Sequence, residues 1–303
     1  MKHVFIVNPK AGKKDVTPEI QTFLTSQPND FKYELHITED VNDAFVFTRE
    51  FASHHRAEET RFYVCGGDGT LNEVVNGAMG FPNVSVACYP SGSGNDFIKN
   101  YGTHQDFLNL KNLIYGKEKV IDVFKVNDRY TINICNLGFD AVAADNMVRF
   151  KKKKFVSGKM AYTLGLLYSL LFNMKSFASI FVDGVQIGEG EFLLCTIANG
   201  ICYGGGYYCA PRATTDDGLL DIMTVKPISR LKFISIIKVY KQGKHLDDKR
   251  LESILTYLRG KKVEIIAPQP IIYCMDGEIA HADKITMEIV PQALKFVIPA
   301  NIA

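Results

Sequence analysis

Short apolar runs alternate with amphipathic segments over about the first 120 residues of the chain. Four runs rich in β-branched and aromatic residues are predicted to be strands, at residues 3–7, 33–38, 61–65 and 84–89. Helices are predicted between them, because apolar residues recur at helical spacing over residues 41–52 and 71–78. A further helix is predicted to start at Thr17 as N-cap, with Pro18 at the first helical position. This alternation predicts an α/β fold: a parallel sheet with helices on both faces.

The pattern changes after about residue 122, where short strands dominate. Two pairs of strands flank Asn127-Asp128 and Asp183-Gly184, and both pairs are typical of two-residue β-hairpins. Further strands are predicted at residues 191–198, 219–225, 262–266, 271–275, 285–290 and 294–298, with helices near 157–173 and 229–241. The second half is therefore predicted to be mainly antiparallel β, and we expect one domain over residues 1–122 and another over 123–290.

Composition limits the classes of protein to consider. The 303 residues suffice for two domains, and 47% hydrophobic with 22% charged residues is typical of globular proteins. The net charge of +2 gives no indication of a nucleic-acid partner, and none is expected. Seven cysteines without a C-x-x-C pair predict reduced core residues in a cytoplasmic protein. The apolar run at 161–172 is shorter than the roughly 20 residues that span a bilayer, so no transmembrane segment is expected.

The strongest chemical signal is a glycine cluster directly after the third predicted strand. Residues 66–69 read Gly-Gly-Asp-Gly, and Thr70 and Glu73 have the spacing of a capping box that would start a helix just after the glycines. A helix start of this kind offers unpaired N–H groups to a phosphate, which glycines allow to approach closely. Asp68 would then repel the phosphate unless a cation lay between them, so Asp68 is a candidate Mg²⁺ partner. The alternative is a tight turn without a ligand.

Two similar loops follow other predicted strands. Residues 8–13 read Asn-Pro-Lys-Ala-Gly-Lys after the first strand, and residues 90–97 read Pro-Ser-Gly-Ser-Gly-Asn-Asp-Phe after the fourth. Loops that leave the carboxyl ends of parallel strands meet at one crevice, so we expect the three loops to form one site. None of them matches the P-loop or the dinucleotide-binding fingerprint, which excludes these two classes of nucleotide site.

In combination, the three loops resemble the nucleotide signatures of the diacylglycerol, sphingosine and ceramide kinases, and more distantly those of NAD kinases and phosphofructokinases. The resemblance implies an NAD kinase-like α/β domain that binds ATP and is completed by residues 291–303 after the β-rich lipid-substrate domain. It assigns nucleotide binding to Asn8, Pro9, Lys10, Ala11, Gly12, Thr38, Gly66, Gly67, Asp68, Gly69, Thr70, Leu71, Asn72 and Ser93. At position 93, threonine is commoner in the family, and the serine keeps the hydroxyl.

Three motifs extend the resemblance over the second half, at residues 136–141, 199–211 and 214–221. In bacterial members the last of them holds a structural Mg²⁺. By that likeness the ligands here would be Asp217 and the carbonyl oxygens of Thr214 and Leu219. Carboxylate and carbonyl oxygens suit a hard cation, but a plain Asp-Gly turn into a strand is the alternative.

A final motif, Asp276-Gly277-Glu278, follows the strand predicted at residues 271–275. It matches a family motif whose glutamate is thought to act as general base. The resemblance therefore implies that Glu278 accepts the proton of the acceptor hydroxyl, with Asp68 as the second catalytic carboxylate. Asp276 is expected to form the turn or orient a neighbour. Taken alone, the motif would be a common hairpin turn.

The basic run at residues 149–154 precedes an apolar segment that reaches residue 175. It is either a core helix with a solvated cap or a segment that lies on an anionic membrane surface. We expect a cytoplasmic lipid kinase that acts on a membrane lipid at the inner bilayer face. The alternatives are a kinase for a sphingoid base or a soluble NAD-like acceptor, and a non-catalytic nucleotide-binding regulator. A homodimer is left open.

Overall fold

In the computed structural model, which describes residues 1–151, 158–172 and 174–303, the first half of the chain folds around four parallel strands. They are β1 (Lys2–Val7), β2 (Tyr33–Ile37), β3 (Thr60–Gly66) and β4 (Val84–Pro90), in the spatial order β4-β3-β1-β2. Every residue of β3 and β4 is buried, as is typical of strands covered on both faces. The predicted parallel sheet is confirmed.

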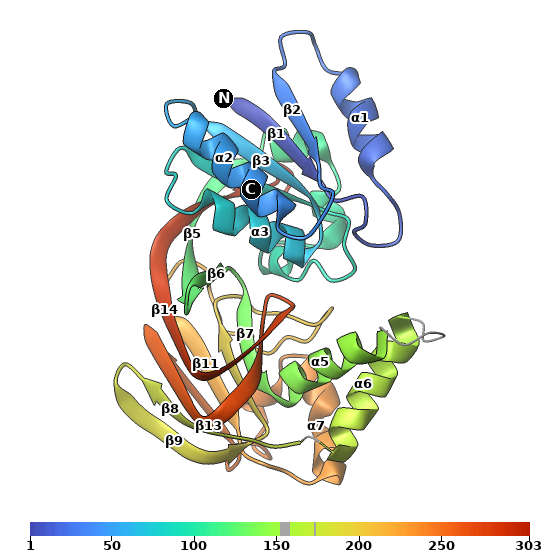
Figure 1. Cartoon of the computed structure of the whole chain (residues 1–303). Coiled ribbons are helices and arrows are strands. Elements are labelled where there is room, and N and C mark those ends of the chain that lie inside the picture. The colour runs from blue at the N-terminus through green and yellow to red at the C-terminus, as the bar shows by residue number, and fades with distance from the viewer. Residues whose placement is uncertain (152–157, 173) are drawn as a thin grey trace.

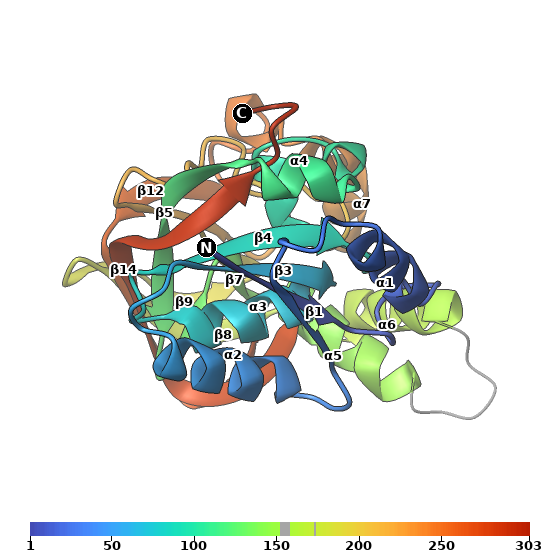
Figure 2. The same cartoon turned by 90° about the horizontal axis from the view of Figure 1, so that it is seen from above.

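Helices α1 (Thr17–Thr25), α2 (Asp43–His54), α3 (Asp68–Ala78) and α4 (Leu110–Ile114) cover this sheet. Right-handed crossovers place α2 and α3 together on one face and α1 on the other (Figure 2). Two short 3₁₀ segments, Phe97–Asn100 and His104–Phe107, follow β4. The predicted start of α1 is wrong by one residue: Thr17 lies inside the helix, and Asp15 Oδ1 accepts a hydrogen bond from its backbone N.

The second half is antiparallel, as predicted. Its strands are β5 (Lys117–Val126), β6 (Arg129–Thr131), β7 (Ile134–Gly138), β8 (Ser176–Val182), β9 (Val185–Phe192), β10 (Leu194–Ala198), β11 (Leu220–Val225), β12 (Leu255–Gly260), β13 (Lys262–Met275) and β14 (Glu278–Ile298). Both predicted hairpins are present, β5–β6 and β8–β9. Their turns place Asn127 and Asp183 at φ of 50° and 49°, a region that Asn and Asp tolerate better than other non-glycine residues.

The 21-residue strand β14 joins the two halves of the molecule (Figure 1). It pairs with β13 and β5 in the second half, and near its end Lys295 and Phe296 pair in parallel with β4. The four strands predicted separately at 262–266, 271–275, 285–290 and 294–298 are therefore two long strands. Each has an irregular register at the predicted break, between Ile266 and Ile271 and between Val290 and Leu294.

Three helices lie in the second half: α5 (Phe139–Lys151), α6 (Gly158–Phe172) and α7 (Arg230–Lys241). Helices α6 and α7 match the two predicted ones. Helix α5 was not predicted; it starts directly after Gly138, whose φ of 87° and tight contact with the Leu193 carbonyl exclude a side chain. Within the described ranges, no helix is both long enough and apolar enough to cross a membrane. Residues 152–154 of the basic run lie outside the described residues.

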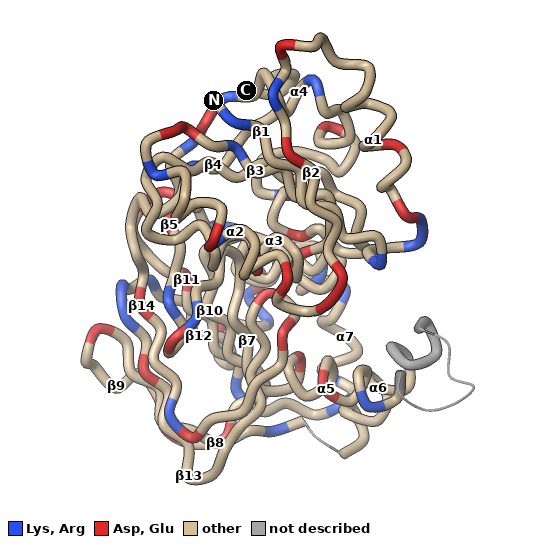
Figure 3. The backbone as a smooth tube through the Cα atoms, turned by 45° about the horizontal axis from the view of Figure 1, so that its top comes forward, with Lys and Arg blue, Asp and Glu red and all other residues tan. Residues whose placement is uncertain are grey.

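Three hydrophobic clusters form the core. The first includes Phe5, Phe62 and, from the end of β14, Phe296. The second lies among the antiparallel strands, and the third lies under α7. All seven cysteines are free and buried, in agreement with the prediction that they are reduced core residues. Basic and acidic positions are interspersed over most of the chain, in keeping with its small net charge (Figure 3).

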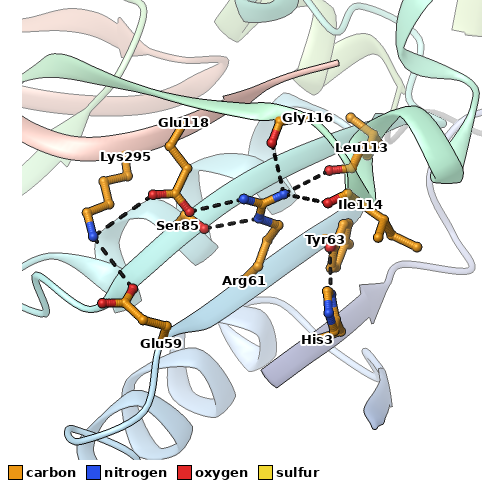
Figure 4. Close-up of polar contacts among 10 residues, drawn as sticks. All are labelled: His3, Glu59, Arg61, Tyr63, Ser85, Leu113, Ile114, Gly116, Glu118 and Lys295. Carbon is orange, nitrogen blue, oxygen red and sulfur yellow. Dashed lines mark hydrogen bonds and ion pairs between the residues drawn. The ribbon is translucent and has the colours of Figure 1, made fainter. Parts of the chain in front are cut away.

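A buried arginine on β3 ties the first sheet to α4 and β5 (Figure 4). Arg61 is 4% exposed, and its Nη2 atom lies 3.1 Å from Glu118 Oε1. The remaining donors bond to Ser85 Oγ and to the carbonyl oxygens of Leu113, Ile114 and Gly116. Because these carbonyls lie at the end of α4, the guanidinium satisfies acceptors that the helix itself cannot.

Replacing Arg61 by leucine should lower the free energy of unfolding by about 3–5 kcal/mol, since it leaves buried carbonyls and a partly buried carboxylate without their partner. Urea denaturation measures the difference. Arg212→Leu is the matched control, because Arg212 forms an exposed ion pair with Asp247 and should contribute less than about 1 kcal/mol. Equal losses for the two variants would contradict the structural role of Arg61.

Candidate active site

The three glycine-bearing loops meet at the carboxyl ends of β1, β3 and β4, as predicted. A Cβ atom on Gly12 would lie 2.0 Å from the carbonyl oxygen of Ser91, and one on Gly92 would lie 2.4 Å from the Cα of Gly67. Side chains at these glycines would therefore push the loops apart. Asn8 Nδ2 also donates to Thr70 Oγ1 at 3.0 Å, which fixes the first loop against α3.

Helix α3 begins inside the glycine cluster, with Gly67 as N-cap and Asp68 as its first residue. The predicted capping box is wrong, because both side chains bond elsewhere. Thr70 accepts from Asn8, and Glu73 Oε1 accepts from the backbone N of Asn42 at 2.9 Å. The first N–H groups of the helix have no intrahelical acceptor, which leaves this end suited to an anion. A side chain on Gly69 would meet nothing within 4 Å, so space is open there.

Asp68 lies beside a second carboxylate, that of Asp96 in the loop after β4. Asp68 Oδ1 accepts from the backbone N of Asp96 at 2.7 Å. Burial, with the nearby charge of Asp96 next in size, raises the pKa of Asp68 to about 6. The Asp96 carboxylate accepts from Lys99 Nζ at 2.5 Å and from the backbone N of Gly205 at 2.9 Å. Asp96 and Gly205 lie within the sequence motifs, but the motifs predict no role for either residue.

The Asp68 carboxylate suits a divalent cation. It is partly exposed at the first residue of α3 and belongs to none of the ion pairs of the described residues, whereas Asp96 is already paired with Lys99. A cation that also binds the phosphates would offset the charge of Asp68, so Asp68 is the residue that would hold Mg²⁺. Among the described residues, no cluster of three or more His, Cys, Asp or Glu side chains has the arrangement of a metal site, so phosphate and water oxygens would have to complete the coordination.

The metal site expected at Thr214, Asp217 and Leu219 does not fit a cation in this arrangement. The Asp217 carboxylate pairs with the guanidinium of Arg259 and accepts from Thr214 Oγ1. Its other oxygen accepts from the backbone N of Leu219 at 3.1 Å. A carboxylate neutralised by arginine offers little to Mg²⁺, so these contacts favour the alternative of a structural Asp-Gly turn.

Asp276 ties the two halves of the site together. Its two carboxylate oxygens accept hydrogen bonds from three backbone N–H groups of the β6–β7 segment and from Asn72 Nδ2 on α3. The backbone donors belong to Ile132, Asn133 and Ile134. Because Asn72 is engaged with Asp276 and with the carbonyl of Tyr130, its side chain links α3 to the second half rather than facing a nucleotide.

Glu278 stands at the start of β14 and lines a hollow of about 280 Å³ between the β5–β6 and β13–β14 hairpins. Its Oε2 atom lies 2.5 Å from Arg129 Nη1. Within the described part of the chain, Arg129 is the one side chain bonded to this carboxylate, so Oε1 is left to accept a proton or a hydroxyl. No sequence motif predicts a role for Arg129.

The other residues expected to bind nucleotide differ in their burial and in their hydrogen bonds. Thr38 is buried beyond the end of β2, where its backbone N donates to the carbonyl of Val7. Leu71 is 2% exposed and packs in the core, so only its backbone could face a ligand. Lys10 Nζ donates to the carbonyl of Glu39, whereas Ser93 is exposed.

Comparison with known families accounts for nearly the whole chain. Residues 2–126 match the diacylglycerol kinase catalytic domain, and residues 133–298 match the YegS C-terminal NAD kinase β-sandwich-like domain. A diacylglycerol kinase from Bacillus subtilis is 28% identical over 280 residues, which is 90% of this chain and 88% of that protein. A YegS-like lipid kinase of Shewanella frigidimarina, named as probable, is 29% identical over 299 residues, 96% of this chain and 92% of that protein.

Solved structures share the fold. A diacylglycerol kinase from Bacillus anthracis superposes with a TM-score of 0.72 at 23% identity, covering 100% of this chain and 98% of that one. An NAD kinase from Archaeoglobus fulgidus, in complex with ATP, superposes with a TM-score of 0.52 at 13% identity, covering 99% and 94%. The predicted combination of an NAD kinase-like α/β half with a β-rich half is confirmed.

Proposed function

Since the chain belongs to the diacylglycerol kinase family, with a catalytic domain followed by a YegS-type C-terminal domain, we propose that it transfers the γ-phosphate of ATP to the hydroxyl of a lipid such as diacylglycerol. Residues 1–122, completed by 291–303, bind the nucleotide, and residues 123–290 bind the lipid. The observation that carries this proposal is the meeting of three glycine loops around the start of α3, beside the Asp68–Asp96 pair.

The triphosphate would lie on the backbone N–H groups at the start of α3, where the positive end of the helix and the small residues favour an anion. Mg²⁺ held by Asp68 would neutralise the phosphate charge. The chain's own contribution is to fix the positions of the reacting groups, since phosphoryl transfer depends mainly on positioning and on charge stabilisation.

The acceptor hydroxyl would enter the hollow beside Glu278. The hydroxyl proton would pass to Glu278 Oε1 while Arg129 holds Oε2, which keeps the carboxylate in one orientation. The contact between Asp276 and Asn72 supports this reading, because it links the Asp276-Gly277-Glu278 turn directly to α3. The hydroxyl oxygen then forms its bond to the γ-phosphorus as the bond to the β-bridging oxygen breaks, and ADP leaves.

Transfer of radiolabelled γ-phosphate to a total lipid extract, followed by identification of the labelled product, tests the proposal. We expect one chloroform-soluble lipid phosphate, which the Glu278→Gln variant should label about 100-fold more slowly or slower still. Parallel reactions with diacylglycerol micelles, sphingosine and NAD separate the alternatives, since an NAD-type kinase would label only the soluble acceptor. Tight ATP binding without label in any acceptor would instead indicate a nucleotide-binding regulator.

The pH dependence of turnover should report Asp68. Because the pKa of this carboxyl is raised to about 6, it becomes protonated as the pH falls through 6 and can then no longer hold a cation. We expect kcat/KM for Mg·ATP to fall about tenfold per pH unit below that value, since kcat/KM reports the free enzyme. Steady-state rates between pH 5 and 8 measure the profile. A flat profile across pH 6 would contradict this assignment.

A further inference from the structure

Helices α6 and α7 present large apolar side chains to solvent. On α6, Leu167, Leu171 and Phe172 are 48%, 54% and 68% exposed. On α7, Leu231 and Ile234 are 81% and 59% exposed, while Phe233 and Ile236 of the same helix face the core. Helix α7 therefore has large apolar side chains on both its inner and its outer side, and α6 also exposes large apolar side chains, whereas a surface helix normally has a polar outer face.

The two exposed faces adjoin. The Arg230 guanidinium at the start of α7 donates to the carbonyl oxygens of Leu170 and Leu171 in the last turn of α6, at 2.8 and 2.5 Å. Leu231 follows Arg230 directly, so it lies next to this last turn. We call the surface formed by Leu167, Leu171, Phe172, Leu231 and Ile234 the α6–α7 patch.

The charged residues on α7 and just beyond its two ends have one sign. Residues 226–244 contain six basic residues and no acidic one: Lys226, Arg230, Lys232, Lys238, Lys241 and Lys244. Among the ion pairs of the described residues, none includes a basic residue of α7. Lys232 and Lys238 are therefore available to an external anion. This contrasts with the mixed charges over most of the molecule (Figure 3).

We infer that the α6–α7 patch docks on an anionic lipid bilayer, with Leu231, Ile234, Leu171 and Phe172 entering the interface and the lysines of α7 contacting the headgroups. Large exposed apolar groups beside basic residues are the combination that binds such a surface. A soluble protein partner would satisfy the apolar side chains but would need acidic groups to match the lysines. The inference deepens the proposed lipid kinase function, on which it rests, by naming the surface that meets the substrate's membrane.

Sedimentation with vesicles of phosphatidylcholine, with and without phosphatidylglycerol, tests this surface. The full chain should bind the anionic vesicles at low salt and less at high salt. Leu231→Ser with Ile234→Ser, and separately Lys232→Gln with Lys238→Gln, should each weaken binding about tenfold. The control pairs Val41→Ser with Val185→Ser and Lys111→Gln with Lys284→Gln change exposed residues outside the patch and should bind as the parent does.

The chain contains no tryptophan, so a single one gives a fluorescence probe without background. Emission from a Phe172→Trp variant should shift to shorter wavelength on adding anionic vesicles, and emission from Val185→Trp should not. Unchanged binding of both patch variants, or an unshifted Phe172→Trp emission with vesicles present, would overturn the inference. The parent and the patch variants should phosphorylate a monomeric short-chain acceptor at the same rate. This reaction tests the proposed kinase function independently of membrane binding.

Discussion

Replacing Glu278 by glutamine should lower kcat for lipid phosphorylation by about 10²–10⁴-fold, the usual contribution of a positioned general base. Glutamine keeps the shape of the side chain but cannot accept the hydroxyl proton. Because Glu278 lines the hollow beside the hairpins and not the glycine loops, the affinity for Mg·ATP should change little. Single-turnover kinetics and equilibrium nucleotide binding measure the two quantities independently.

The matched control for this variant is Glu288→Gln, which makes the same change at an exposed position on the same strand. It should keep parental activity. An Arg129→Gln variant should give an intermediate loss, since it frees Glu278 without removing its carboxylate. If Glu278→Gln turned over as fast as the parent on a lipid acceptor, Glu278 would not be the base.

Replacing Asp68 by alanine should damage nucleotide binding and turnover together, with a loss of about 10²-fold or more in kcat/KM, because it removes the carboxylate placed to hold Mg²⁺. Binding of ATP without Mg²⁺ should not weaken, since a negative charge near the phosphates is lost. Calorimetric titrations with and without Mg²⁺ distinguish these effects, and Asp30→Ala, an exposed change, serves as control. Equal weakening in both titrations would contradict the metal-holding role.

Stability gives a readout of the same residue that does not depend on activity. The pKa of Asp68 is higher in the folded protein than the ordinary value of 3.8. Its ionisation therefore costs folding free energy as the pH rises from about 4 to 6, and this cost persists above pH 6. Asp68→Asn should then melt at a higher temperature than the parent at pH 8, and the difference should shrink toward pH 4.

Local patterns predicted the elements of the fold where the sequence alone decides the conformation. The turn residues Asn127 and Asp183 identified both hairpins, because few residues accept positive φ at a two-residue turn. The convergence of the glycine loops followed from the parallel sheet, since its strand ends share one edge. These inferences needed no knowledge of contacts between distant residues.

Contacts between distant residues account for what the sequence did not predict. Thr70 and Glu73 have capping-box spacing, but their side chains accept hydrogen bonds from Asn8 and Asn42 of other loops. The ion pair by which Arg129 orients Glu278 is likewise a contact between residues far apart in the sequence. No local pattern reports such pairings.

The acidic pair shows the same limit. Gly205 is separated from Asp96 by 108 residues, and its backbone N donates to Asp96 only in the folded protein. The sequence does hold a local signal for Asp96, since it follows a glycine loop of the predicted site. Helix α5 was missed for a local reason: its first turns hold small and acidic residues that give a weak apolar stripe.

We propose that the backbone of residues 66–70 binds a triphosphate opposite the carboxylate of Glu278. A crystal structure with Mg²⁺ and a non-hydrolysable ATP analogue tests it most directly. We expect phosphate oxygens on the first N–H groups of α3, the cation at Asp68, and the γ-phosphate facing the hollow that Glu278 lines. Nucleotide bound elsewhere, or a γ-phosphate turned away from Glu278 in every copy, would contradict it.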